Sequence, residues 1–587
     1  MSRAQSRISV RATSLLLAMG LLVSTAHSQP KQAPTKPDDL LQEKLSLLSN
    51  LQGLVARAKQ LEKPLARGTA EAEIADAAWS LDRELAKELL RDAYSLSFPE
   101  EAEQARLRKR PVGAQPQMPT PADNARSSVR GRVMKIAARD RAFADELARS
   151  AAEKLGPYEA HRSYASLAGS AIEESDYEAA RKYITQSIEA DPTQITGPSV
   201  INQLAAKNRD AADAATLAYI DHLNSLTLSA TNGSRGRVLF SLSMLIQPNE
   251  FFTKISGIAP PGPAVMRAYV AYVLNSVAVV EQQSPGTITA FRLLLLSIYP
   301  LLKQYAPELR QQFLDLEQRS RKPGESLSLP TAKGIEEEYK AKRDKQEERE
   351  LESDRPDEII IQRVISRGDF SKARKMIDKL ADGPQKAQLT EMLNAQEAIS
   401  LANKVDIPGA QKLAESLVKA GSILRVFPVI AGKCAAKNDD SCARDTINQA
   451  VRQLKKADVT PFAPPPGVPA SIIGTSKDFD LVLTSLGSLA SAVISLKDDL
   501  ALDVLDELVI TANHSELDTG QGRTGFETSL FKKLAEKNEE RTNAAALQLQ
   551  DSLRQIVALA AIDQWKAGKL AKAEAASRNN DSTVRKK

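Results

Sequence analysis

The chain has 587 residues, too many for one ordinary globular core, so we expect several domains or one long repeat array. Hydrophobic residues make up 42% and charged residues 26%, as in soluble proteins, and a net charge of +5 is too small to predict binding to nucleic acid. Aromatic residues make up only 4%, which argues mildly against a sugar-cleaving cleft, because such clefts usually stack sugar rings on aromatic side chains.

The first 28 residues have the pattern of a secretory signal peptide. A basic segment without acidic residues is followed by a short apolar run, Leu15 to Val23. Small residues at Ala26 and Ser28 predict cleavage after Ser28, and the run is too short to span a bilayer comfortably. We therefore expect an exported protein, periplasmic or extracellular, with an uncleaved anchor as the alternative. Cleavage leaves 76 basic against 74 acidic residues, because it removes three arginines (Arg3, Arg7 and Arg11).

Helical patterns fill residues 38–325, after a linker rich in proline, lysine and glutamine at residues 29–37. Apolar residues recur at helical spacing from Leu40 to Leu61. Four prolines in residues 110–121 predict a loop, because proline cannot donate a helical hydrogen bond.

Residues 264–280 are the best candidate for a membrane span after the signal peptide. Arg267 and Asn275 interrupt this apolar run, so it is better interpreted as a helix buried inside a helical array. We therefore predict no integral membrane span once the signal is removed.

The second half of the chain repeats the helical pattern. A dense run of mixed charge without an apolar stripe predicts a linker or exposed helix at residues 326–357. Helical patterns resume over residues 358–576, and the polar tail, residues 577–587, is expected to be disordered. Strand patterns are nearly absent, so the predicted class is all-α, built from antiparallel helix pairs in two halves.

Residues 164–192 predict a helical hairpin. Ser175 is expected to be the N-cap of its second helix, with Glu178 completing a capping box. The hairpin resembles a tetratricopeptide repeat, a helix–turn–helix unit of about 34 residues. Ala171 departs from that family, which usually has an aromatic residue there. The matching positions are Tyr164, Leu167, Ala168, Ala180, Ile184, Ser187 and Pro192.

Weaker matches to the pattern of this hairpin occur at residues 368–373, 407–417, 441–443 and 569–573. Ala373, Ala410 and Ala443 are 37 and 33 residues apart, close to the repeat length of that family. The resemblance covers about a quarter of the chain and implies a degenerate TPR-like α-solenoid or arc whose concave face binds a peptide or protein segment. The chain as a whole resembles exported bacterial helical proteins. A helical array without repeats is the alternative.

The chain has two cysteines, Cys434 and Cys442, on either side of an expected turn. In an oxidising compartment such a pair predicts one structural disulfide, which would stabilise the fold by about 2–3 kcal/mol. Two buried free thiols are the alternative, and a redox-active pair is disfavoured because the CxxC spacing is missing.

The loop at residues 520–525 formally matches the glycine-rich fingerprint GxGxxG. A dinucleotide site would need a strand before this loop, and the preceding residues read as a helix. A mobile loop between helices is the favoured interpretation. The alternative is an anion-binding loop formed by Gly520, Gly522 and Gly525, with Arg523 nearby.

The sequence contains no catalytic, metal-binding or cofactor motif. His161, His222 and His514 each stand far from another histidine or cysteine. We therefore predict a non-enzymatic exported scaffold, without a cofactor, that binds a protein or peptide partner in the cell envelope. The alternatives are a hydrolase acting on an envelope polymer and a structural protein of the envelope.

Overall fold

The computed structural model describes residues 37–109, 120–194, 196–226, 234–246, 259–283, 287–321, 344–345, 347–353, 357–457, 481–496, 499–515 and 517–584. The expected signal peptide and nearly all of the linker after it lie outside the described residues, as do most of the expected proline-rich loop at 110–121 and most of the charged segment at 326–357.

The regular elements of the described residues are all helical. The first half contains α1 (Pro37–Ala58), α2 (Pro64–Ala78), α3 (Arg83–Leu96), α4 (Glu101–Arg108), α5 (Pro121–Ala137), α6 (Arg141–Leu155), α7 (Pro157–Glu173), α8 (Tyr177–Ala190), α9 (Thr196–Lys207), α10 (Arg209–Ser225), α11 (Ser234–Ile246), α13 (Pro263–Gln283), η1 (Thr287–Phe291), α14 (Arg292–Tyr305), η2 (Pro307–Leu309) and α15 (Arg310–Ser320).

The second half contains α17 (Glu358–Ser366), α18 (Phe370–Asp378), α19 (Pro384–Asn403), α20 (Ile407–Ala414), α21 (Ala420–Ala436), α22 (Asp440–Leu454), α23 (Leu481–Val493), α24 (Leu500–Asn513), η4 (Thr519–Gln521), α25 (Ser529–Lys537), α26 (Glu539–Leu547) and α27 (Ser552–Val584). The predicted all-α class is therefore confirmed, and the helix pairs stack in the manner of a solenoid.

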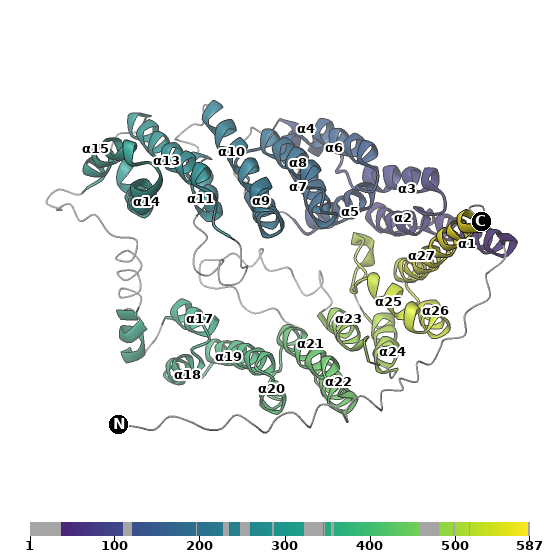
Figure 1. Ribbon diagram of the computed structural model, residues 1–587. Coiled ribbons are helices and arrows are strands. Elements are labelled where there is room, and N and C mark those ends of the chain that lie inside the picture. Colours follow the sequence, from purple (N-terminus) through teal and green to yellow (C-terminus); the bar gives the residue numbers. More distant parts are fainter. Residues whose placement is uncertain are drawn as a thin grey trace, which may run out of the picture.

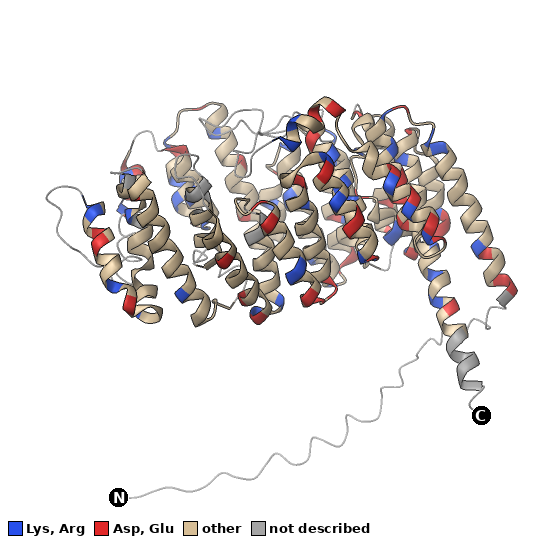
Figure 2. Cartoon of the chain, turned by 90° about the horizontal axis from the view of Figure 1, so that it is seen from above, with Lys and Arg blue, Asp and Glu red and all other residues tan. Residues whose placement is uncertain are grey.

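The helices are arranged around a ring in two layers (Figure 1). The inner layer runs through α17, α19, α21, α23, α25 and α27, continues into α2, α5, α7 and α9, and each of these helices packs on the next. Most inner helices pair with an outer helix that follows in sequence, as α7 does with α8 and α21 with α22. Seen from above, the helices stand side by side in roughly one direction (Figure 2). The ring closes where α27 packs on α1 and α2.

Four hairpins share one turn geometry, which accounts for the repeat pattern. In each turn an aspartate caps the second helix with its side chain, and its backbone N–H bonds to the carbonyl five residues earlier. The residue before each aspartate has a positive φ, and the alanine four residues after it is fully buried. The capping aspartates are Asp176, Asp369, Asp406 and Asp439.

Three expectations about local structure are wrong. The N-cap of α8 is Asp176 rather than Ser175, because Ser175 has φ 62° and supplies the left-handed turn residue. The match to the hairpin pattern expected at residues 569–573 lies inside α27, so these residues form no turn. α27 also continues to Val584, so residues 577–584 are helical rather than disordered.

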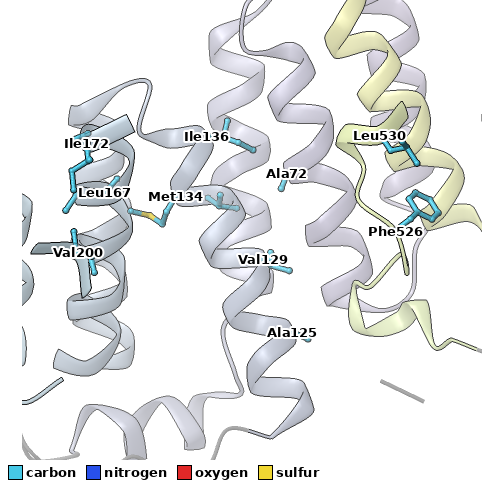
Figure 3. Close-up of a cluster of buried hydrophobic side chains, with 14 of the residues drawn as sticks. Ala72, Ala125, Val129, Met134, Ile136, Leu167, Ile172, Val200, Phe526 and Leu530 are labelled. Atoms are coloured by element: carbon cyan, nitrogen blue, oxygen red, sulfur yellow. The ribbon is translucent and has the colours of Figure 1, made fainter. Parts of the chain in front are cut away.

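One large apolar cluster spans both predicted halves, with members from Leu51 to Leu316 and from Ala395 to Ile562. A smaller cluster, from Ile360 to Leu393, covers α17, α18 and the start of α19. The two halves therefore share a core through the ring closure. In that closure Ala72 of α2 lies between Val129 and Phe526 (Figure 3).

Among the described helices, α13 is long and apolar enough to cross a membrane by length and composition. Its apolar window has a mean hydropathy of 1.4, and 56% of that window is buried inside the fold. Tyr269, Val273 and Val277 are fully buried. These contacts agree with the interpretation of residues 264–280 as a helix of the array.

Candidate functional site at the ring seam

We call the contact of α27 with α1 and α2 the seam. Helix α2 is the most enclosed element of the seam, because α1, α3, α5 and α27 all pack on it. Its composition is unusual for a buried helix, since small residues alternate with three acids, Glu71, Glu73 and Asp76. The side chains of all three are nearly inaccessible to solvent. Small residues let the neighbouring helices approach closely, and each buried acid needs a partner.

Arginines supply these partners. Arg132 of α5 donates Nε and Nη2 to the two carboxylate oxygens of Glu73, each at 2.9 Å, and Nη2 also donates to Asp76 at 2.6 Å. Arg139 holds the other oxygen of Asp76 at 2.6 Å, and Arg67 pairs with Glu71 at 2.7 Å. Burial raises the pKa of Glu73, and the charge of Arg132 opposes this rise.

The glycine loop, residues 520–525, for which anion binding was the alternative interpretation, is part of the seam. Gly522 has φ 73°, and its carbonyl accepts a hydrogen bond at 3.1 Å from Thr69 Oγ1 of α2. A Cβ at Gly522 would lie 2.5 Å from Thr69 Oγ1 and 2.7 Å from the carbonyl oxygen of Leu65. Arg523 donates to the carbonyl of Pro121 at the start of α5. The glycines therefore permit close packing of the C-terminal half on the N-terminal half.

A buried arginine of α27 donates hydrogen bonds to this loop and to the end of α24. Arg554 of α27 is 2% exposed and donates to the carbonyls of Thr524, at 3.0 Å, and Ala512. It also donates to Ser515 Oγ at 3.2 Å. The arginine thus ties α27 to the end of α24 and to the glycine loop. The sequence offered no signal for this residue, because its partners are backbone carbonyls.

A cavity of about 550 Å³, which we call the seam pocket, lies between α2, α5, α25, α27 and the loop. The pocket is strongly polar, with buried acids, cations and several hydroxyl groups in its wall. Its volume lies in the usual range for a small-molecule site. Its wall includes the charged and hydroxyl-bearing residues Glu73, Asp76, Ser128, Arg132, Lys135, Arg139, Glu527, Thr528, Ser529 and Lys532.

The three histidines lie apart from the seam pocket. His161 is buried in α7, where Nδ1 lies 2.9 Å from the carbonyl and 3.0 Å from the hydroxyl oxygen of Ser187, and burial lowers its pKa. His514 Nδ1 lies 2.8 Å from the carbonyl of Ile510. Neither His222 nor His514 forms an ion pair within 4.0 Å with a described carboxylate. In the described part of the chain no group of His, Cys, Asp and Glu could hold a metal ion.

Cys434 and Cys442 are joined by a disulfide, with their Cα atoms 5.7 Å apart. They lie five residues before and three residues after the capping Asp439, in one of the four shared turns. Ala171 and Ala179 occupy the same two positions around Asp176. The disulfide therefore links the end of α21 to the start of α22, and Cys434 is buried.

Replacing both cysteines by serine is expected to lower the free energy of unfolding by about 2–3 kcal/mol, because the cross-link no longer restricts the unfolded chain. Denaturant melts under oxidising conditions measure the loss, and reduction of the native chain should match it. Placing cysteines at Ala171 and Ala179 in the serine variant should form a new disulfide, because the turn is the same. Failure of this pair to oxidise would show that the two turns are not equivalent.

Asp563 is a further buried acid, on α27, which packs against α26. Burial raises its pKa to about 6, and the nearby charges of Lys566 and Glu539 oppose each other. An unfolded aspartate has a pKa of about 3.9, so the fold favours the protonated form. The stability that protonation provides is complete below about pH 4 and is lost as the pH rises through 6.

Asp563→Asn is therefore expected to stabilise the protein at pH 7 by about 1–3 kcal/mol and to have almost no effect at pH 4. Urea melts across this pH range measure the difference. Glu540→Gln, at an exposed position of α26, is the matched control and should change stability little at either pH. A gain from Asp563→Asn that is independent of pH would contradict the assignment.

No protein-family model matches the sequence, and no curated protein matches it. A search of solved structures finds similarity to a protein described as "Circular tandem repeat protein with novel repeat topology and enhanced subunit contact surfaces". The alignment covers 91% of this chain and 99% of that chain, at 14% sequence identity and a TM-score of 0.12. Because that score is too low to transfer geometry, the ring described above rests on contacts within this chain. These contacts make the chain a helical-repeat protein whose last helix, α27, packs on its first helices, α1 and α2.

Proposed function

We propose that this protein is an exported scaffold that binds an extended segment of a protein partner on the inner layer of its ring and carries out no chemistry itself. The observation that carries the proposal is the continuous inner layer, in which each helix packs on the next. Arrays of this kind, including the TPR-like arrays that the sequence resembles, bind partners on such surfaces.

The solvent-facing stripe of α5 consists of Asn124, Ser128, Gly131 and Lys135, at helical spacing. In α7 the partly exposed stripe is Tyr158, Arg162, Ser166, Gly169 and Glu173. The two stripes are neighbours, because Arg162 donates to Ser127 and Lys135 lies 4.0 Å from Glu173. Polar side chains interspersed with glycine suit an extended peptide, whose backbone needs hydrogen bonds and close approach.

Two features support the exported location. The signal pattern of the first 28 residues directs secretion, and the disulfide between Cys434 and Cys442 is typical of an oxidising compartment. N-terminal sequencing of the protein from fractionated cells tests this part of the proposal. We expect the mature chain to start at Gln29 in the exported fraction. Retention of the full chain in the cytoplasm would contradict it.

The hydrolase alternative needs two carboxylates that face each other across a cleft. The best pair is Glu73 and Asp76, and both are held by Arg132. One guanidinium already holds both carboxylates on the same helix, so they do not face each other across a cleft, and this arrangement favours a structural role.

Site-specific photo-cross-linking tests the inner layer. A photoreactive residue at Gly131 should capture one protein reproducibly from envelope extract, because this position is exposed and has open space around it. The same residue at Glu189, an exposed position on α8 in the outer layer, is the matched control and should capture no specific protein. Equal capture at both positions would contradict binding on the inner layer.

A further inference from the structure

We propose that the seam pocket binds a small carboxylate ligand between Lys135 and Lys532 and that this ligand locks the ring closed. This site borders the α5 stripe of the inner layer and shares Ser128 and Lys135 with it, whereas Lys532 belongs to the pocket alone. The pocket is assembled from helices at both ends of the chain, so it exists only when the ring is closed.

Some charged side chains of the pocket have an oppositely charged partner in contact with them, and others do not. Glu73 and Asp76 are matched by the two arginines that hold them, Arg132 and Arg139. Lys532 of α25 is half-buried and forms no ion pair within 4.0 Å with another described residue. Lys135 of α5 reaches only Glu173, at 4.0 Å, and both of these side chains are largely exposed.

The ammonium groups of Lys135 on α5 and Lys532 on α25 therefore line the pocket, and neither has a described carboxylate closer than 4.0 Å. A half-buried lysine is stabilised by an anion placed beside it, because the attraction is screened less there than at the surface. The pocket wall has one further acid, Glu527, and this side chain is exposed. An anionic ligand would supply the missing charge.

The net charge of the pocket wall favours a singly charged anion. The wall has four cations, Arg132, Lys135, Arg139 and Lys532, against three acids, Glu73, Asp76 and Glu527. A surplus of one positive charge remains, and a singly charged carboxylate matches it better than a doubly charged phosphate does. Lysine ammonium groups act as point charges and bind a carboxylate without the fork geometry that arginine imposes. The exposed hydroxyl group of Ser128 can hydrogen-bond the rest of the ligand.

The size of the pocket admits either a free organic acid or the last residues of a peptide with its terminal carboxylate. Titration calorimetry on the full protein distinguishes these sources. The probes are acetyl-Ala-Ala-Ala with a free C-terminus, the same peptide as its amide, butyrate and inorganic phosphate. Binding of the free-acid peptide alone assigns a peptide C-terminus, and binding of butyrate, a singly charged carboxylate, assigns a free acid. Either result supports a carboxylate site.

Lys532→Met is expected to weaken binding of the carboxylate probe about tenfold, because one of the two cations is lost. Lys533→Met, next to it on α25 but outside the pocket wall, is the matched control and should leave the affinity unchanged. Bound ligand should also raise the melting temperature of the native protein, because it binds only the closed ring. The melting temperature without ligand checks that each variant folds.

Four results would overturn the proposal: equal binding of the peptide acid and amide, tighter binding of phosphate, no binding of either carboxylate at millimolar concentration, or an affinity unchanged by Lys532→Met in a folded variant. Cross-linking at Gly131 in the Lys532→Met variant separates the two proposals, because Lys532 is not part of the inner-layer stripes. A partner captured there by the Lys532→Met variant would leave that function intact.

Discussion

Gly522→Ala is expected to open the seam and to lower the free energy of unfolding by about 2–4 kcal/mol. The new Cβ would lie 2.5 Å from Thr69 Oγ1 and 2.7 Å from the carbonyl oxygen of Leu65, where neither α2 nor the loop has room to move. Gly522 also has φ 73°, a conformation that costs an alanine about 1–2 kcal/mol. Both penalties fall on the contact that joins the two ends of the chain.

Hydrogen–deuterium exchange measures where the protein opens. Faster exchange in α2 and α27, with α19 to α21 unchanged, would show that the damage is confined to the seam. Gly131→Ala is the matched control, because an added Cβ there meets nothing within 4 Å. That change should be neutral or stabilise α5 by up to about 1 kcal/mol. Equal melting temperatures for the native protein and Gly522→Ala would contradict the assigned role of this glycine.

Arg554→Met is expected to cost about 3–5 kcal/mol. The substitution keeps most of the side-chain volume but leaves the carbonyls of Thr524 and Ala512 without their buried donor. Because the side chain is 2% exposed, water cannot readily replace these hydrogen bonds. We expect the glycine loop to detach from α27 and the ring to open at the same place as in Gly522→Ala.

A double-mutant cycle tests this link. If both residues act on one closure, the cost of the combined variant should be well below the sum of the two single costs. Lys569→Met, at an exposed position further along α27, is the control for loss of a cation from this helix and should change stability little. Additive losses would show that Arg554 supports the end of α24 and not the seam.

The sequence predicted the helices and one hairpin well, because these depend on local patterns. Tyr164 to Pro192 folds as the expected helix pair, and the turns before Ala373, Ala410 and Ala443 have one geometry. The expected capping box of Ser175 and Glu178 is wrong, because the N-cap lies one residue later, at Asp176, whose partner in the first turn is the backbone N–H of Ala179. A serine and an aspartate stood side by side, and only the backbone shows that the serine takes the left-handed position.

The seam could not be predicted, because it depends on contacts between distant residues. Thr69 and Gly522 are 453 residues apart, and no local pattern relates them. The glycine motif at 520–525 matches the pattern of a site that needs a strand, whereas Gly522 allows the loop to pack on α2. No sequence pattern marks Arg132, Lys135 and Lys532, since single cations on helices usually face solvent.

The closure between α27 and the first helices has a consequence for how the chain reaches its folded state. Arg57 hydrogen-bonds Gln555, 498 residues further along, so the buried acids of α2 lack their complete surroundings until nearly the whole chain has been made. Contacts of such long sequence separation form late, because the entropy of closing so large a loop is lost before any contact compensates for it. Biogenesis therefore ends with the joining of the two termini, and a chain truncated before α27 should expose α2 and be a target for proteolysis.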